Sequence, residues 1–119
     1  MRYSFGSLSI TKEAIHLANE ALNSGRVTQG NLVSKFEKKF AEIVGVKEAV
    51  AVSSGTDADV IALSCLYEVG AKRGDEIILP ALSFVATGNA VVHAGFKPVF
   101  VDVEKDTYNL NPSKIKPAI

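Results

Sequence analysis

Tryptophan is absent from this sequence, cysteine occurs once, and neither sign of charge is in excess. A single cysteine, Cys65, excludes an internal disulfide framework. The 13 lysine and arginine residues balance the 13 aspartate and glutamate residues, so no basic field exists to gather nucleic acid or an anionic membrane. No apolar stretch reaches the roughly 18–20 residues that a membrane helix needs. We therefore expect neither a nucleic-acid partner nor a membrane partner.

Signatures of secretion, dinucleotide binding and metal binding are also missing. Residues 1–10 hold one arginine and no long apolar core, so we expect no secretory signal and a cytoplasmic protein. Neither G-x-G-x-x-G nor G-x-x-x-x-G-K-[ST] follows an apolar run. His16 and His93 stand far apart, so no metal-type spacing occurs and no metal is expected. We predict that Cys65 and His93 are buried packing residues.

Hydrophobic periodicity and turn residues divide the chain into alternating elements. Helices are predicted at about residues 11–24, 32–44, 57–69 and 83–94, each followed directly by a glycine. Short apolar runs predict buried strands at residues 49–52, 76–79 and 98–103. Helices that separate such strands favour an α/β fold, here a three-layer sandwich with a mostly parallel sheet.

The predicted organisation is a single partial domain over residues 1–119. N-terminal helices fill about residues 1–47, and the sheet region begins at about residue 48. Asn111 and Pro112 are typical of a helix start, and under two turns follow before Ile119. The sequence therefore reads as interrupted at its C-terminal end.

A small polar turn, Ser53 to Thr56, lies between a predicted strand and a predicted helix. The first N–H groups of a helix are unpaired and carry partial positive charge, so they form an anion site that phosphate commonly fills. Gly55 permits close backbone approach, and Ser54 and Thr56 can add hydroxyl donors. Asp57 opposes an anion by charge unless it offers only its amide. The alternative for this turn is an ordinary helix cap.

Phe84 follows the second predicted strand, beside the first. An aromatic ring at that position can stack on a flat ligand ring. The alternative is a core phenylalanine.

Four segments resemble, in order and nearly in spacing, the sugar-aminotransferase (DegT/StrS) family of fold-type I pyridoxal-phosphate (PLP) enzymes. They are Ser54–Ala58, Gly74–Ile78 leading to Pro80, Ser83–Thr87, and Pro98–Val103 followed by Asp106–Asn109. The resemblance extends from about Ser9 to Ile119. Val27 stands where the family often has tryptophan or tyrosine, and the loop at residues 71–73 is slightly long.

The resemblance implies a cofactor, a site and a reaction. Gly55, Thr56 and Asp57 match the turn that holds the PLP phosphate, and Phe84 matches the residue that stacks on the pyridine ring. The implied activity is amino transfer, with glutamate as donor, onto a nucleotide-linked keto sugar, by a homodimer active in polysaccharide biosynthesis. In the family, the lysine that bonds the cofactor and the acid that faces its ring nitrogen lie further downstream, so no catalytic residue is assigned here.

Two alternatives remain open. Some relatives carry histidine in place of that lysine and dehydrate the sugar instead of aminating it. A chain of 119 residues can also be an inactive α/β interaction piece, whose exposed sheet edge favours pairing with another chain.

Overall fold

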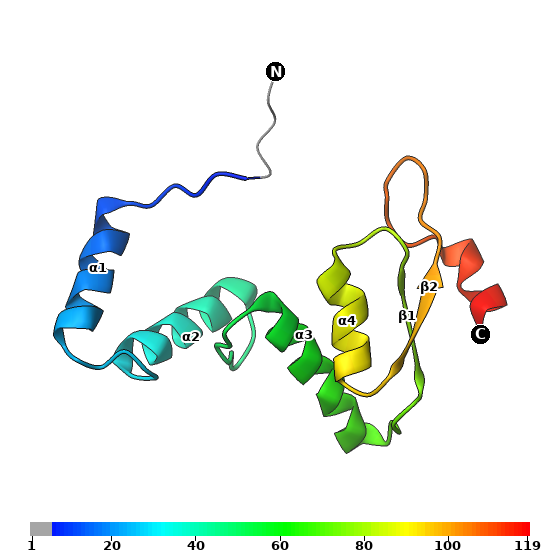
Figure 1. Ribbon diagram of the computed structural model, residues 1–119, viewed down its shortest axis with the longest axis horizontal. Helices are drawn as coiled ribbons and strands as arrows, with labels where there is room; N and C mark the ends of the chain where they lie inside the picture. The colour runs from blue at the N-terminus through cyan, green and yellow to red at the C-terminus, as the bar shows by residue number, and fades with distance from the viewer. Residues whose placement is uncertain (1–5) are drawn as a thin grey trace. The chain divides into compact units, whose positions relative to one another are not determined.

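The computed structural model describes residues 6–119, which form two compact units (Figure 1). We name them the helical unit, which ends at Ala51, and the sheet unit, Val52–Ile119. The expectation about a secretory signal falls partly on residues 1–5, outside the described part. In the described part, no helix has both the length and the apolar character needed to cross a membrane.

Local capping signals define the helical unit. Helix α1, Lys12–Asn23, begins after Thr11, whose hydroxyl accepts the Ala14 N–H at 3.1 Å. Helix α2, Asn31–Val44, ends at Gly45, whose φ of 75° is the left-handed conformation that glycine adopts without strain. Both helices match their predicted positions closely. Lys38 and Lys39 are exposed on α2, and so are the apolar Phe36 and Phe40.

The sheet unit is a β–α–β crossover with one further helix. Helix α3, Gly55–Ser64, continues into a 3₁₀ helix, η1, Cys65–Val69. Strand β1, Glu76–Pro80, helix α4, Val85–His93, and strand β2, Lys97–Val101, follow. The strands pair in parallel, from Glu76 opposite Lys97 to Pro80 opposite Val101.

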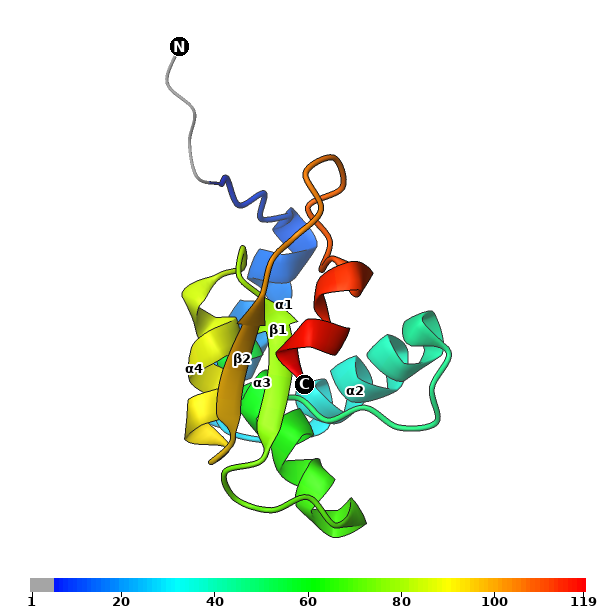
Figure 2. The ribbon, with the colours of Figure 1, turned by 90° about the vertical axis from the view of Figure 1, so that its right-hand side faces the viewer.

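Layers of different structure cover the two faces of this sheet. Helix α4 lies on one face, with α3 packed beside it, and the C-terminal turns lie on the other (Figures 1 and 2). Those turns are 3₁₀ helices η2, Pro112–Lys114, and η3, Lys116–Ala118. The core between sheet and helices consists of Leu79, Val91, Ala94 and Phe96. The predicted α/β fold class is therefore confirmed.

The predicted strand at residues 49–52 is wrong, because this segment has no regular structure. A strand exists only where a neighbour completes its hydrogen-bond ladder. Here the Ala51 N–H donates instead to the Glu37 carboxylate at 2.9 Å. The strand predicted at residues 98–103 ends early, at Val101, and Val103 forms an isolated antiparallel bridge with Leu110.

The predicted burial of Cys65 and His93 is also wrong, since both residues are exposed. Helix α4 buries Ala90 and Val91, and Ala94 follows them on the same side. His93 falls outside this stripe. Cys65 falls outside the corresponding stripe of Val60 and Leu63, which pack against the core.

Candidate functional site

The turn before α3 is organised by two serines and one aspartate. Ser54 caps the helix, and its hydroxyl oxygen accepts the Asp57 N–H at 3.1 Å. In return the Ser54 hydroxyl donates to the Asp57 carboxylate at 2.9 Å. The Ser53 hydroxyl donates to the same carboxylate oxygen. Ser54 and Asp57 thus cap the helix reciprocally, although the carboxylate accepts the Ser54 hydroxyl and not the Ser54 backbone N–H that a capping box uses.

This cap leaves two backbone donors free at the start of α3. Helical bonding begins with the Ala58 N–H, which donates to the Ser54 carbonyl at 3.1 Å. Within residues 6–119, the N–H groups of Gly55 and Thr56 have no hydrogen-bond partner, and neither has the Thr56 hydroxyl. Three donors at a helix start therefore remain available to an anion.

Open space lies above Gly55. A Cβ added there would meet no atom within 4 Å, so the packing of this chain does not itself require glycine. The missing side chain leaves room for a ligand oxygen to approach the backbone closely. This turn consequently fits a phosphate group.

Asp57 carries the charge that opposes an anion. The hydroxyls of Ser53 and Ser54 lower the pKa of its carboxyl below the ordinary value of 3.8. The carboxylate is therefore ionised at neutral pH, with both serine protons directed at it. The Asp57 amide is engaged by Ser54, so the free donors belong to Gly55 and Thr56.

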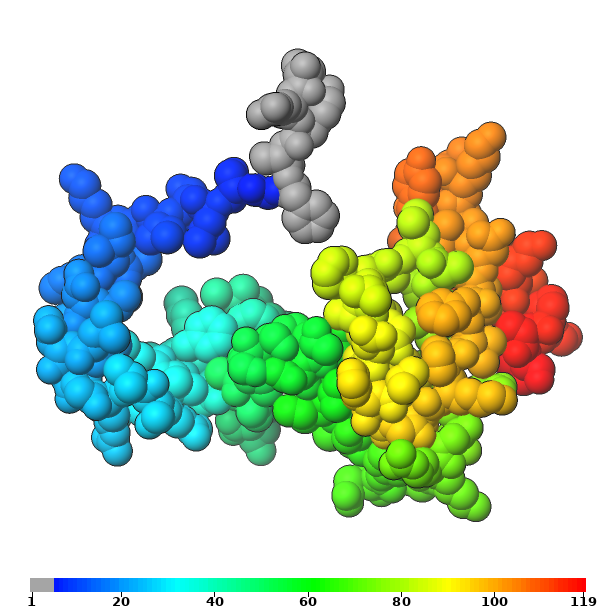
Figure 3. Space-filling model, in the orientation of Figure 1, coloured from blue at the N-terminus to red at the C-terminus, as the bar shows by residue number. Residues whose placement is uncertain are grey.

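Phe84 stands at the start of α4, four residues after β1 ends at Pro80. Its side chain is 69% exposed, which removes the alternative of a core position within the sheet unit. The segment that leads into α4 lies at the surface (yellow-green in Figure 3). The hydroxyls of Ser83 and Thr87, 2.8 Å apart, bracket this helix start. A large exposed ring beside a strand end is suited to covering a flat ligand.

The turn before α3 and the segment that leads into α4 lie at the same end of the sheet unit. Helices α3 and α4 pack together, and both begin toward the end of the sheet where β1 finishes (Figures 1 and 2). In open α/β sheets, ligands bind outside the carboxyl ends of the strands.

Ser53 is the participant that the sequence interpretation missed. The capping-box spacing of Ser54 and Asp57 was the available signal for this cluster.

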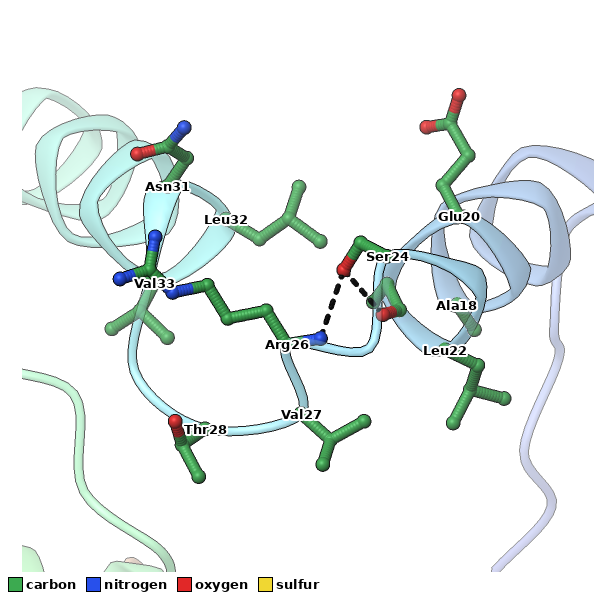
Figure 4. Close-up of a pocket in the computed structure, with 12 residues that line it drawn as sticks. Ala18, Glu20, Leu22, Ser24, Arg26, Val27, Thr28, Asn31, Leu32 and Val33 are labelled. Atoms are coloured by element: carbon green, nitrogen blue, oxygen red, sulfur yellow. Dashed lines mark hydrogen bonds between the residues drawn. The ribbon is translucent and has the colours of Figure 1, made fainter.

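A hollow lies within the helical unit, between the end of α1 and the start of α2 (Figure 4). Its volume is about 700 Å³. The Ser24 hydroxyl holds the turn, since it donates to the Ala21 carbonyl at 2.7 Å and accepts the Arg26 N–H at 3.1 Å. The Arg26 side chain extends toward the first turn of α2 (Figure 4) and passes within 3.5 Å of the position of a Cβ on Gly30.

Comparison with known proteins identifies the chain's relatives. The family model of the DegT/DnrJ/EryC1/StrS aminotransferase family matches residues 8–119. The chain belongs to this family. The spore coat polysaccharide biosynthesis protein SpsC of Bacillus subtilis is 43% identical over 92% of this chain and 28% of its own length. The 3-oxo-glucose-6-phosphate:glutamate aminotransferase of the same organism is 39% identical over 91% of this chain and 24% of its own.

A solved structure of this family has the same fold. The E. coli GDP-4-keto-6-deoxy-D-mannose-3-dehydratase with bound hydrated PLP superposes with a TM-score of 0.87 at 31% identity, over 99% of this chain and 31% of its own. The chain thus spans less than a third of the length of each of these three relatives. The predicted family is confirmed, and PLP is confirmed as the cofactor of the family's structures.

Proposed function

We propose that residues 1–119 form the N-terminal, phosphate-holding portion of a PLP-dependent aminotransferase that acts on a nucleotide-linked keto sugar. The observation that carries this proposal is the turn at Ser54–Asp57, with free Gly55 and Thr56 donors and open space above Gly55, together with the exposed ring of Phe84 at the start of α4. Family membership supports the same assignment.

Each residue of this site has a role that follows from its geometry. The Gly55 and Thr56 N–H groups and the Thr56 hydroxyl donate to the phosphate, which is close to a dianion at neutral pH. Phe84 covers one face of the cofactor ring and keeps water from it. PLP, when bound, acts as an electron sink for the exchange of amino and keto groups. The residue that bonds the cofactor and the partner of its ring nitrogen belong to the rest of the polypeptide.

Glutamate is the amino donor that we propose. The support is one relative whose name includes it, the 3-oxo-glucose-6-phosphate:glutamate aminotransferase. The name of SpsC supports a place in polysaccharide biosynthesis. We propose that the protein works in the cytoplasm, where such soluble substrates are made.

Dehydration of the sugar is the second candidate. A 3-dehydratase that binds PLP superposes on this chain with a TM-score of 0.87, so the N-terminal portion is compatible with either reaction. The residue at the cofactor-bonding position, lysine or histidine, decides between them.

A homodimer is the assembly that we propose. Its support is the apolar stripe of α2, where Phe36, Phe40 and Ile43 are exposed within the helical unit. Exposed apolar surface of this kind marks a contact with other protein. The pocket at the Arg26 turn is a candidate for the substrate cleft or the subunit contact. Sedimentation of the complete polypeptide at micromolar concentration tests the assembly, and a monomer there would contradict it.

The activity is tested with the complete polypeptide that contains residues 1–119, incubated with PLP, L-glutamate and a nucleotide-linked keto sugar. Amino transfer converts glutamate to 2-oxoglutarate and the keto sugar to an amino sugar, which mass spectrometry separates from a dehydrated product. An amino sugar supports the first candidate and a dehydrated sugar supports the second. A polypeptide that binds no PLP would refute both and favour the inactive interaction piece.

A further inference from the structure

The carboxylate of Asp57 is the least expected group in a phosphate site. It lies in the first turn of α3, where it shares the favourable positive end of the helix with any bound anion. Two like charges at one helix start repel each other, and the repulsion is partly offset when the donors are divided between them. The hydrogen bonds of the turn make that division.

Asp57 takes the side-chain donors of the turn for itself. Its Oδ2 atom accepts the hydroxyl protons of both Ser53 and Ser54, the latter at 2.9 Å. Its own N–H is used by the Ser54 oxygen at 3.1 Å. Neither serine hydroxyl therefore presents its proton to an anion. The free donors are the N–H groups of Gly55 and Thr56 and the Thr56 hydroxyl.

We propose that Asp57 is a positioning residue that fixes the Ser53–Gly55 turn through the two serine hydroxyls and so aims the Gly55 and Thr56 donors at the PLP phosphate. This inference rests on the proposed function. A carboxylate that accepts the hydroxyls of two successive residues, on a residue whose own amide is bonded to one of them, restrains the chain between Ser53 and Asp57. Pre-ordered donors bind an anion more tightly because less conformational freedom is lost on binding.

The hydrogen bonds of Asp57 also explain why an acidic side chain is compatible with a phosphate site. Charge-assisted hydrogen bonds from both serines disperse the charge of the carboxylate. The lowered pKa of Asp57 reports the same contacts. Asp57 acts on the phosphate only through the turn and does not touch it in this assignment.

The test compares PLP with pyridoxal, which has the same ring and lacks the phosphate, on the complete polypeptide. Asp57→Asn keeps the shape of the side chain and one acceptor oxygen but removes the charge, so the two serine hydroxyls lose their charge-assisted acceptor. We expect the affinity for PLP to fall about tenfold, on the scale of one charge-assisted hydrogen bond. The affinity for pyridoxal should stay within about twofold, because its ring contacts are unchanged.

The matched control is Asp59→Asn, which removes the same charge two residues further along α3. Asp59 is exposed and makes no side-chain hydrogen bond within residues 6–119. The PLP affinity of the Asp59→Asn variant should stay within about twofold of that of the parent, since the turn is untouched. If Asp57→Asn fails to fold, Ser53→Ala removes one of the two hydroxyls with the charge retained, and it should weaken PLP binding about threefold or more.

Several outcomes overturn the inference while the proposed function survives. Unchanged or tighter PLP binding by Asp57→Asn would show that the carboxylate only repels the phosphate. An equal loss of PLP and pyridoxal affinity would show a general structural role. An equal loss of PLP affinity in Asp59→Asn would show that the effect comes from the removed negative charge and not from the hydrogen bonds of the turn. A parent protein that binds PLP no better than pyridoxal would instead refute the phosphate site itself, and this inference with it.

Discussion

Replacement of Phe84 by alanine separates a ligand contact from a packing contact. The Phe84 side chain is 69% exposed, so its loss removes little contact with the rest of the sheet unit. We expect the free energy of unfolding to change by about 0.5 kcal/mol or less, as at other surface positions. Loss of a stacking contact is worth about 0.5–1.5 kcal/mol, which corresponds to a roughly two- to thirteenfold weaker affinity for PLP.

The contrast is Phe96, which is 5% exposed and stacks on Tyr67 with ring centroids 4.8 Å apart. Its replacement by alanine should cost about 3–5 kcal/mol, as for other buried aromatic residues. A second control is Phe84→Leu, which keeps the apolar bulk and removes the aromatic face. It should weaken PLP binding nearly as much as alanine does.

The assay is a PLP titration of the complete polypeptide, with urea unfolding of the cofactor-free protein measured separately. If Phe84→Ala costs about 3 kcal/mol of stability and leaves PLP affinity within about twofold, Phe84 is a packing residue and the stacking role is wrong. If Phe84→Leu binds PLP as the parent does, the contact is apolar and owes nothing to the aromatic face.

Three further predictions concern the turns of the sheet unit. Gly55→Ala should keep or raise stability by up to about 1 kcal/mol, because the new Cβ meets no atom within 4 Å and the unfolded chain is less free with alanine than with glycine. The affinity for PLP should fall about tenfold. An affinity equal to that of the parent in a titration would contradict the phosphate site. Gly95→Ala should cost about 2 kcal/mol or more in urea unfolding, because φ is +87° and the Cβ would lie 2.9 Å from the Tyr67 hydroxyl, and an unchanged midpoint would refute this packing. The carboxyl of Asp57 should titrate by NMR below its ordinary pKa of 3.8, so its stabilising contribution is present above that pH and is lost as pH falls through the lowered pKa; Ser53→Ala should move the pKa back upward.

The sequence was sufficient for features governed by near neighbours. Both helices of the helical unit end near glycines, and Gly45 adopts the left-handed conformation that the cap requires. The apolar runs at β1 and β2 predict their parallel pairing because a helix of suitable length separates them. Asn111 accepts the Ser113 N–H at 3.0 Å, as its place before a proline indicates.

Features that depend on distant partners were not predictable. The run at residues 49–52 has the composition of a buried strand, but strand formation needs a hydrogen-bonded neighbour, and this run pairs with no strand within residues 6–119. Helix α3 is apolar around much of its circumference, so periodicity cannot tell its buried side. Val60 and Leu63 pack against the core, whereas Ile61 and Cys65 are exposed.

Part of the candidate site was accessible from sequence and part was not. The free donors of Gly55 and Thr56 follow from their place at a helix start. The engagement of the Asp57 amide depends on the Ser54 side-chain rotamer, and the shared acceptor depends on a second hydroxyl from Ser53. Side-chain choices of this kind are decided by three-dimensional proximity, which periodicity does not encode.

The position of Tyr67 determines what aromatic spectroscopy can report about this chain. The sequence has no tryptophan and three tyrosines. Tyr67 is stacked on Phe96, and its hydroxyl donates to the Ala94 carbonyl at 2.7 Å, whereas Tyr108 is 66% exposed. Near-ultraviolet circular dichroism depends on fixed packing, so its tyrosine signal follows the sheet unit through Tyr67. Residues 6–51 contain neither tyrosine nor tryptophan, and melting of α1 and α2 is therefore seen in the far-ultraviolet amide bands and not in that signal.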